Sequence, residues 1–200
     1  MPVIEFLQSL RHPVLDLLFR SITFLGNEEF FILLLPIAYW TWRKETMQQL
    51  AFLLLISFAL NALAKNLIAL PRPPVVYHLV HAEGFGLPSG HAQGAITLWG
   101  FVFLSTPNRW IKTGTLFLLI TIPLSRLYLG VHYPRDVIAG LLLGGVWLGL
   151  FWICHDRVKQ RWKLSLPASL GLLVVVTTGF VTLSPTRLGG TVGGVELGML

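Results

Sequence analysis

The sequence predicts an all-α polytopic membrane protein, a bundle of six transmembrane helices with an N-terminal amphipathic helix at the membrane interface. Apolar residues make up 54% of the 200 residues and charged residues only 12%, about half the charged share of a soluble domain. The apolar residues gather in long runs. Short basic clusters separate alternate runs, a pattern typical of cytoplasmic loops. We therefore expect residues 1–200 to form a single membrane domain.

Residues 4–25 predict the interfacial helix. His12, Asp16 and Arg20 recur every four residues and so share one helical face. An amphipathic helix of this kind lies in the interface, with its apolar side at the acyl boundary. That side would contain Ile4, Leu7, Leu15, Leu18 and Ile22. The alternative is a seventh span whose polar seam is buried in the bundle.

The six-helix bundle is expected over about residues 28–184. Its spans correspond to the apolar runs 30–42, 51–70, 92–104, 111–124, 137–154 and 164–183. Several runs are shorter than the roughly 20 residues of a spanning helix, so those helices include flanking polar residues or tilt. The glycine-rich residues 185–200 form a tail to which the sequence assigns no role.

The basic clusters set the predicted orientation. They lie at 43–44, 109–112 and 157–163, after the first, third and fifth runs, which places these loops in the cytoplasm. The junctions 27–29, 71–90 and 125–136 are then extracytoplasmic, as are both termini. Residues 1–10 lack a basic stretch and contain Glu5, so no cleaved signal peptide is expected.

Composition excludes several other classes of function. The one cysteine, Cys154, allows neither an intramolecular disulfide nor a thiolate zinc site. The net charge of +6 resides in loop clusters of a membrane protein, which argues against nucleic-acid binding.

Three polar segments fall at helix ends that the orientation places outside the cytoplasm. In the first, Lys65 is followed seven residues later by Arg72 in a proline-rich turn, so two cations lie near each other. Taken alone, this segment is more simply explained by interfacial anchoring. In the second, Ser89 can cap a helix, Gly90 offers unhindered backbone N–H groups for a phosphate, and His91 can donate a proton. The alternative there is an ordinary helix cap with a hydrated histidine.

The third segment pairs His132 with Asp136. If helical, the two residues share a face, so the carboxylate can hold one imidazole nitrogen while the other attacks. Pro134 fits the first turn of the next helix, and Arg126 offers a fork for a phosphoryl group. The alternative is an ion pair of Asp136 with Arg135 or Arg126, with His132 solvated.

The spacings Lys-x6-Arg-Pro, Pro-Ser-Gly-His and Ser-Arg-x5-His-x3-Asp, in this order, resemble the signature motifs of the type-2 phosphatidic acid phosphatase family, the lipid phosphate phosphatases. That family shares its site with the vanadium haloperoxidases and bacterial acid phosphatases. The likeness is complete at every motif position between residues 65 and 136. The chain looks like bacterial members of the phosphatidylglycerophosphatase B or undecaprenyl-diphosphatase kind, which implies the bacterial cytoplasmic membrane as its location.

The resemblance implies hydrolysis through a phosphohistidine. His132 would be the nucleophile, Asp136 would hold its tautomer, and His91 would act as acid and then as base. The phosphate-binding residues implied are Lys65, Arg72, Ser89, Gly90 and Arg126. No cofactor is expected, and no acidic cluster near the three segments would hold a metal.

The expected substrate is a phosphomonoester or diphosphate of a lipid, such as phosphatidylglycerophosphate, phosphatidate or a polyprenyl diphosphate. One alternative is a phosphotransferase that passes the phosphoryl group to a second lipid. Another is a transporter that binds lipid phosphate without cleaving it, although binding does not require the pair of His132 and Asp136. The motifs do not choose among the substrates, and they say nothing of the oligomeric state.

Overall fold

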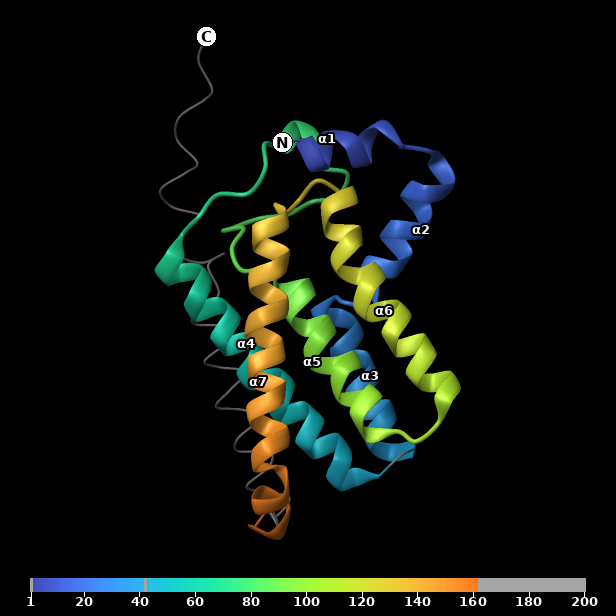
Figure 1. Ribbon diagram of the computed structural model, residues 1–200, viewed down its shortest axis with the longest axis vertical. Helices are drawn as coiled ribbons and strands as arrows, with labels where there is room; N and C mark the ends of the chain where they lie inside the picture. Colours follow the sequence, from blue (N-terminus) through green and yellow to red (C-terminus); the bar gives the residue numbers. More distant parts are fainter. Residues whose placement is uncertain (1, 42, 162–200) are drawn as a thin grey trace.

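The computed structural model describes residues 2–41 and 43–161, and every regular element in these two ranges is a helix (Figure 1). The longer helices are α3 (Glu28–Thr41), α4 (Lys44–Ile68), α5 (Gly90–Ser105), α6 (Arg109–Tyr128) and α7 (Pro134–Arg161). The shorter ones are α1 (Pro2–Ser9), α2 (Pro13–Phe24) and the 3-10 turn η1 (Val75–Tyr77). The predicted all-α class is confirmed over these residues.

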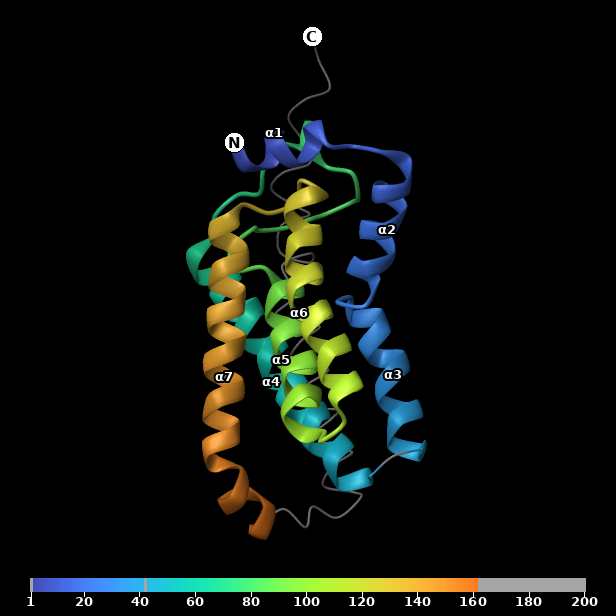
Figure 2. The ribbon, with the colours of Figure 1, turned by 45° about the vertical axis from the view of Figure 1, so that its right-hand side comes forward.

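Helix α5 is the centre of the bundle, because α4, α6 and α7 all pack against it (Figures 1 and 2). The core between α3, α4, α5 and α7 is apolar; it includes Phe31, Leu53, Leu54, Leu98 and Phe101. The outer faces are apolar as well; large exposed side chains there include Ile32, Leu67, Phe117, Leu142 and Val146. Helices that are apolar both toward the core and away from it are typical of a bundle surrounded by lipid.

Five of the six predicted spans coincide with α3 to α7, and the sixth, residues 164–183, lies outside the described residues together with the 185–200 tail. Two helices are long and apolar enough to cross a membrane, Lys44–Ile68 and Pro134–Cys154. Helices α2 and α3 would make a third span, bent by 53°, if they are counted as one. The chain is therefore a helical protein with two to three candidate spans in its described part.

The N-terminal segment differs from the predicted single interfacial helix, because it forms two helices. The Nδ1 atom of His12 accepts a hydrogen bond from the Val14 N–H and caps α2, whose first residue is Pro13. A capping residue followed by proline begins a new helix, so α1 cannot continue into α2.

The apolar side that we expected at the acyl boundary mostly packs inward instead. Ile4 and Ile22 are buried, and Leu7 and Leu15 pack against the cluster around Tyr128. The polar seam forms hydrogen bonds to the rest of the bundle but is not buried in it, since His12 and Arg20 are exposed and Asp16 is half-buried. Asp16 accepts from the Tyr128 hydroxyl at 2.6 Å, and Arg20 donates to the Leu79 carbonyl at 2.7 Å.

Helices α5 and α7 cross at unusually close range because α7 carries glycines at two positions one turn apart. A Cβ atom on Gly140 would lie 2.4 Å from the Ser89 carbonyl oxygen, and one on Gly144 would lie 2.4 Å from Cγ2 of Ile96. Small residues spaced in this way let helix backbones approach in a membrane. The crossing brings the start of α5 to the start of α7, where the Ser89 N–H donates to the Asp136 carbonyl at 2.8 Å.

A buried polar network joins α4 to α5 below this crossing. The Asn61 amide donates to Gln93 Oε1 at 2.7 Å, and the Gln93 amide donates to Ser57 Oγ at 3.0 Å. Ser57 in turn contacts the Thr97 hydroxyl at 3.0 Å. Interhelical hydrogen bonds of this kind hold membrane helices in one register, which here fixes α4 relative to the start of α5.

Candidate active site

The three polar segments meet at one end of the bundle, where α4 and α6 end and α5 and α7 begin (Figure 1). Lys65 lies in the last turn of α4, and Ser89 caps α5. Arg126 lies in the last turn of α6, and Asp136 in the first turn of α7. These four predicted site residues therefore come from four helix ends: two helices end at the site and the helices that follow them begin there.

His132 lies in the turn before α7, with only 1% of its surface exposed. Its Nδ1 atom is 3.5 Å from Asp136 Oδ2, and its Nε2 atom is 2.9 Å from Arg72 Nη1. A guanidinium only donates hydrogen bonds, so Nε2 carries the lone pair and Nδ1 carries the proton that faces the carboxylate. The imidazole thus presents Nε2 as its nucleophilic atom.

The pairing of His132 with Asp136 does not arise from a shared helical face. The structure places His132 in a turn, and Asp136 Oδ2 also accepts from the Tyr133 N–H at 2.9 Å. The alternative of a solvated His132 is wrong, because this side chain is buried. An ion pair of Arg135 with Asp136 Oδ1 at 3.5 Å exists beside the histidine contact.

The pKa of His132 lies well below its usual range. Burial is the main cause, and the positive charges of Arg72, Arg126 and Lys65 lower the pKa further. Both effects disfavour the imidazolium form. His132 is therefore neutral near pH 7, as a nucleophile needs to be.

Arg72 is anchored by backbone carbonyls rather than by headgroups. Its Nε donates to the carbonyls of Glu83 and Gly84 at 3.1 and 3.2 Å, and its Nη1 donates to the Val131 carbonyl at 3.0 Å. The loop after α4 thereby holds the guanidinium against His132. Interfacial anchoring alone does not explain this set of contacts.

Gly86 belongs to the same corner of the site, although it lies outside the three motifs. A Cβ atom there would lie 3.0 Å from Asp136 Oδ2 and 3.3 Å from the Arg72 Cα. The close approach of the loop to the carboxylate therefore depends on glycine. No sequence signal identifies it, since its neighbours in space are distant in the chain.

The start of α5 carries the second segment. Ser89 is fully buried, and its Oγ accepts from the Ala92 N–H at 3.4 Å, so it caps the helix as predicted. Its hydroxyl proton is still available to donate. His91, in the first turn, is hydrogen-bonded within the protein, because its Nε2 lies 2.6 Å from Asn27 Oδ1.

Arg126 is 5% exposed, and its Nη1 donates to the Thr23 hydroxyl at 2.7 Å. Its Nε has no hydrogen-bond partner among the described residues, and neither do Asp136 Oδ1 and His132 Nδ1, whose 3.5 Å contact with Asp136 Oδ2 is an ion-pair contact and not a hydrogen bond. A buried donor without a partner is rare in proteins and points to a ligand that accepts from it. Lys65 and Arg72 add positive charge to the same part of the site, and a positive, buried environment favours an anion.

Other polar residues near the motifs make contacts of their own within the protein. Tyr128 is buried and bonds to Asp16 of α2, so it faces away from His132. Arg135 lies over the Tyr133 ring at 4.9 Å, and His78 Nε2 contacts the Pro73 carbonyl at 2.9 Å. In the described part of the chain, no group of three or more His, Cys, Asp or Glu residues is arranged to hold a metal.

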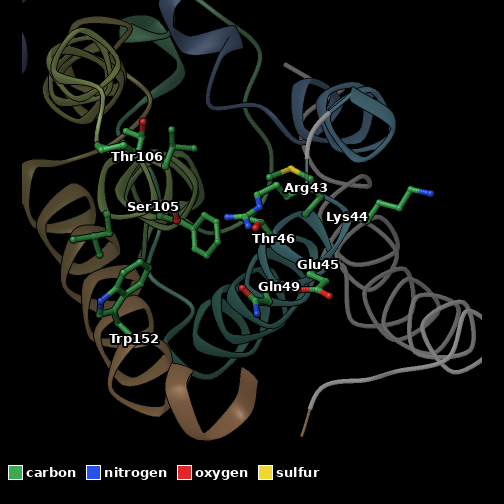
Figure 3. Close-up of a pocket in the computed structure, with 13 residues that line it drawn as sticks. Arg43, Lys44, Glu45, Thr46, Gln49, Ser105, Thr106 and Trp152 are labelled. Atoms are coloured by element: carbon green, nitrogen blue, oxygen red, sulfur yellow. The ribbon is translucent and has the colours of Figure 1, made fainter. Parts of the chain in front are cut away.

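A cavity of about 790 Å³ lies at the opposite end of the bundle, between the start of α4 and the ends of α5 and α7 (Figure 3). Its lining includes Arg43, Gln49, Ser105, Thr106 and Trp152. None of the motif residues contributes to it, so it is separate from the site around His132.

Comparison with known proteins gives consistent matches. The sequence model of the PAP2 superfamily matches residues 47–160. A probable sphingosine-1-phosphate phosphatase of Dictyostelium discoideum is 34% identical over 158 residues, which is 71% of this chain and 39% of that protein. A lipid A 4'-phosphatase of Bacteroides thetaiotaomicron is 29% identical over 162 residues, which is 72% of each chain. The chain spans about two fifths of the length of the sphingosine-1-phosphate phosphatases that it matches.

Two solved structures are similar in fold and sequence. The first is LpxE of Aquifex aeolicus, with a TM-score of 0.68 and 27% identity over 76% of this chain and 93% of LpxE. The second is a transmembrane PAP2 type phosphatidylglycerolphosphate phosphatase of Bacillus subtilis, with a TM-score of 0.69 and 26% identity. That match covers 81% of this chain and 86% of the other.

Proposed function

Because this chain belongs to the PAP2 superfamily, we propose that it is an integral membrane lipid phosphatase that works through a phosphohistidine on His132. The observation that carries the proposal is the buried His132, held between the Asp136 carboxylate and the Arg72 guanidinium. A transport or binding site has no need of a neutral, oriented imidazole.

The chemistry proceeds in two steps. First, His132 Nε2 attacks phosphorus, and a bond from nitrogen to phosphorus forms while the bond from phosphorus to the lipid oxygen breaks. His91 gives a proton to the departing oxygen. Then His91 takes a proton from a water molecule, which attacks the phosphohistidine and releases inorganic phosphate. In the first step Arg72 exchanges its contact with Nε2 for one with a phosphoryl oxygen.

Five groups stabilise the charge on the transferring phosphoryl oxygens. They are the side chains of Lys65, Arg72, Arg126 and Ser89 and the backbone N–H of Gly90. Phosphoryl transfer depends mainly on positioning and charge stabilisation, and cations already arranged in a buried site supply both. The unpaired Nε of the buried Arg126 supports this assignment.

The membrane arrangement is part of the proposal. We place a single domain with six spans in the bacterial cytoplasmic membrane, with the site on the extracytoplasmic face. The basic residues Arg43, Lys44 and Arg109 lie at the end of the bundle away from His132, and the positive-inside rule puts that end in the cytoplasm. The substrate is a phosphomonoester or diphosphate of a lipid, reached from the bilayer surface.

The test is inorganic phosphate release by the purified chain from a panel of lipid phosphates, with EDTA present throughout. The panel contains phosphatidylglycerophosphate, phosphatidate, sphingosine 1-phosphate and a polyprenyl diphosphate. We expect release with EDTA present and complete loss in His132→Ala, because this variant removes the imidazole to which the proposal assigns the attack on phosphorus.

The control variant is His81→Ala, another histidine on the same side of the bundle, whose side chain is exposed. It should keep wild-type activity. Retention of more than about a tenth of the activity in His132→Ala would contradict the phosphohistidine. Transfer to a second lipid without phosphate release would favour a phosphotransferase, and binding without either reaction would favour a transporter.

A further inference from the structure

We propose that Asn27, in the turn between α2 and α3, and Thr23, in the last turn of α2, are positioning residues for His91 and Arg126. The proposal rests on the proposed phosphatase function and assigns roles to residues outside the 47–160 match with the PAP2 superfamily. The turn would complete a site whose reacting groups all lie within that match.

Two hydrogen bonds connect the turn to the site. Asn27 Oδ1 lies 2.6 Å from His91 Nε2, a short contact between segments 64 residues apart. The Thr23 hydroxyl accepts from Arg126 Nη1 at 2.7 Å, across 103 residues. Thr23 is 7% exposed and Arg126 is 5% exposed, so loss of this bond would leave a second guanidinium donor buried without a partner.

The turn is clamped against α5 and α6 by further contacts. The Trp99 indole N–H donates to the Leu25 carbonyl at 3.3 Å. Gly26 is buried, and a Cβ atom there would lie 2.7 Å from Cγ2 of Ile122 and 3.4 Å from Cδ2 of His91. The absence of a side chain at Gly26 is thus what allows Asn27 to reach the imidazole.

The contact with Asn27 sets which ring nitrogen of His91 takes part in proton transfer. Because Oδ1 accepts, Nε2 keeps its proton in both protonation states, and Nδ1 gains and loses the transferable one. The tautomer and the ring orientation are then defined before the substrate arrives. Partners that fix metal-bound histidines through their second nitrogen affect activity by about ten- to a hundred-fold, and we expect an effect of similar size for His91.

The charges around His91 explain why an acceptor is needed. The ionisable groups that face it are Arg126 from α6, His132 from the turn before α7, Lys65 from α4 and Arg72 from the loop after α4. Burial is the main reason why a protonated His91 is disfavoured, and the three permanent cations in this set, Arg126, Lys65 and Arg72, disfavour it further. The Asn27 carbonyl offsets this repulsion with a dipole and introduces no charge that would pair with Arg126.

The experiment compares two substrates in variants of position 27. A lipid alkoxide needs a proton to depart, whereas p-nitrophenolate does not. For Asn27→Ala we expect kcat to fall about ten-fold or more with the lipid phosphomonoester and much less with p-nitrophenyl phosphate, the pattern also expected for His91→Ala. The control is Glu29→Ala, an exposed neighbour in the first turn of α3, which should resemble the wild type with both substrates.

Asn27→Asp keeps an oxygen at the same place and adds a negative charge, so it provides a second test if Asn27→Ala does not fold. An adjacent carboxylate favours the protonated imidazole. The alkaline limb of the kcat profile should therefore move to higher pH by about one unit or more. An unmoved limb would mean that residue 27 does not contact His91 in the working enzyme.

Thr23→Val tests the second contact, since it removes the hydroxyl and keeps the shape. We expect weaker inhibition by vanadate, an anion that mimics the transferring group, with unchanged dependence on the leaving group. One result would overturn this inference and leave the proposed function standing. In that result the wild type releases phosphate, and both Asn27 variants show the same leaving-group dependence and pH profile as the wild type. A wild type that releases no phosphate from any substrate overturns the proposed function, and the inference with it.

Discussion

At the scale of single residues, the site gathers three cations around one neutral imidazole. Arg72 comes from the loop after α4 and is anchored by loop carbonyls. Arg126 comes from the end of α6 and is anchored by the Thr23 hydroxyl. Burial strengthens the interactions of Arg126 and His132, which are 5% and 1% exposed, because the effective dielectric is low there. The arrangement suits a dianionic phosphoryl group, which would replace the contact of Arg72 with His132.

Vanadate should inhibit competitively, because its trigonal-bipyramidal form resembles the transferring phosphoryl group. Arg126→Lys should raise the inhibition constant by about ten- to a hundred-fold. A guanidinium can donate to the Thr23 hydroxyl and still offer further N–H groups to the anion, whereas a lysine ammonium lacks this planar arrangement of donors. Steady-state inhibition kinetics give both values.

The matched control is Arg135→Lys, whose exposed side chain lies over the Tyr133 ring. Its inhibition constant should stay near that of the wild type. If vanadate binds Arg126→Lys as tightly as the wild type, Arg126 does not contact the phosphoryl group.

At the scale of helices, the crossing of α5 and α7 places two of the motifs. Gly140 and Gly144 let the backbones meet, and the Ser89 N–H then bonds to the Asp136 carbonyl. The start of α5 and the start of α7 are therefore one rigid unit as far as the site is concerned. A side chain inserted at the crossing would separate Ser89 from Asp136.

Gly140→Ala should lower both stability and activity, because its methyl group would lie 2.4 Å from the Ser89 carbonyl oxygen. Overpacking of this kind costs about 1–3 kcal/mol. We expect a lower midpoint of thermal unfolding in detergent and a reduced kcat/KM.

Gly145→Ala is the comparison, since a Cβ atom at that position of α7 would meet nothing within 4 Å. This variant should match the wild type in both measurements, or exceed it slightly in stability because alanine favours helix. Equal stability of the two variants would show that the crossing is looser than the structure indicates.

At the scale of the whole molecule, the site and the cavity beside Arg43 lie at opposite ends of the bundle. The outer faces of α4, α6 and α7 expose apolar side chains between these ends. A lipid substrate would thus present its phosphate at one membrane surface while its acyl chains stay in the bilayer. The orientation of the bundle then decides on which side of the membrane phosphate is released.

Cysteine labelling of intact cells tests that orientation, in a background where Cys154 is replaced by alanine. A cysteine at His81, on the side of the site, should react with an impermeant reagent added outside. A cysteine at Ser105, at the opposite end, should react only after permeabilisation, because the positive-inside rule places the basic loops in the cytoplasm. The reverse pattern would place catalysis in the cytoplasm.

Three properties of this protein are predictable from its sequence: the membrane class, the helical fold and the meeting of the motif residues at one end. These properties follow from local signals: apolar runs, basic clusters and motifs at successive helix ends. Antiparallel helices bring alternate ends together, so these signals alone are enough to predict that Lys65, His91 and His132 share one membrane depth. The meeting of His132 with Asp136 was expected too, although through a helical face rather than the observed turn.

The packing of the N-terminal segment and the residues that support the reacting groups are visible only in the folded structure. The break at Pro13, the inward packing of Ile4 and Ile22, and the contacts of Asn27 and Gly86 depend on partners far along the chain. Such contacts produce no periodic pattern or motif in a single sequence, because neither residue is recognisable as a partner until the other is known to lie beside it. Their positions are set by packing and hydrogen bonding between helices, which are properties of the folded bundle.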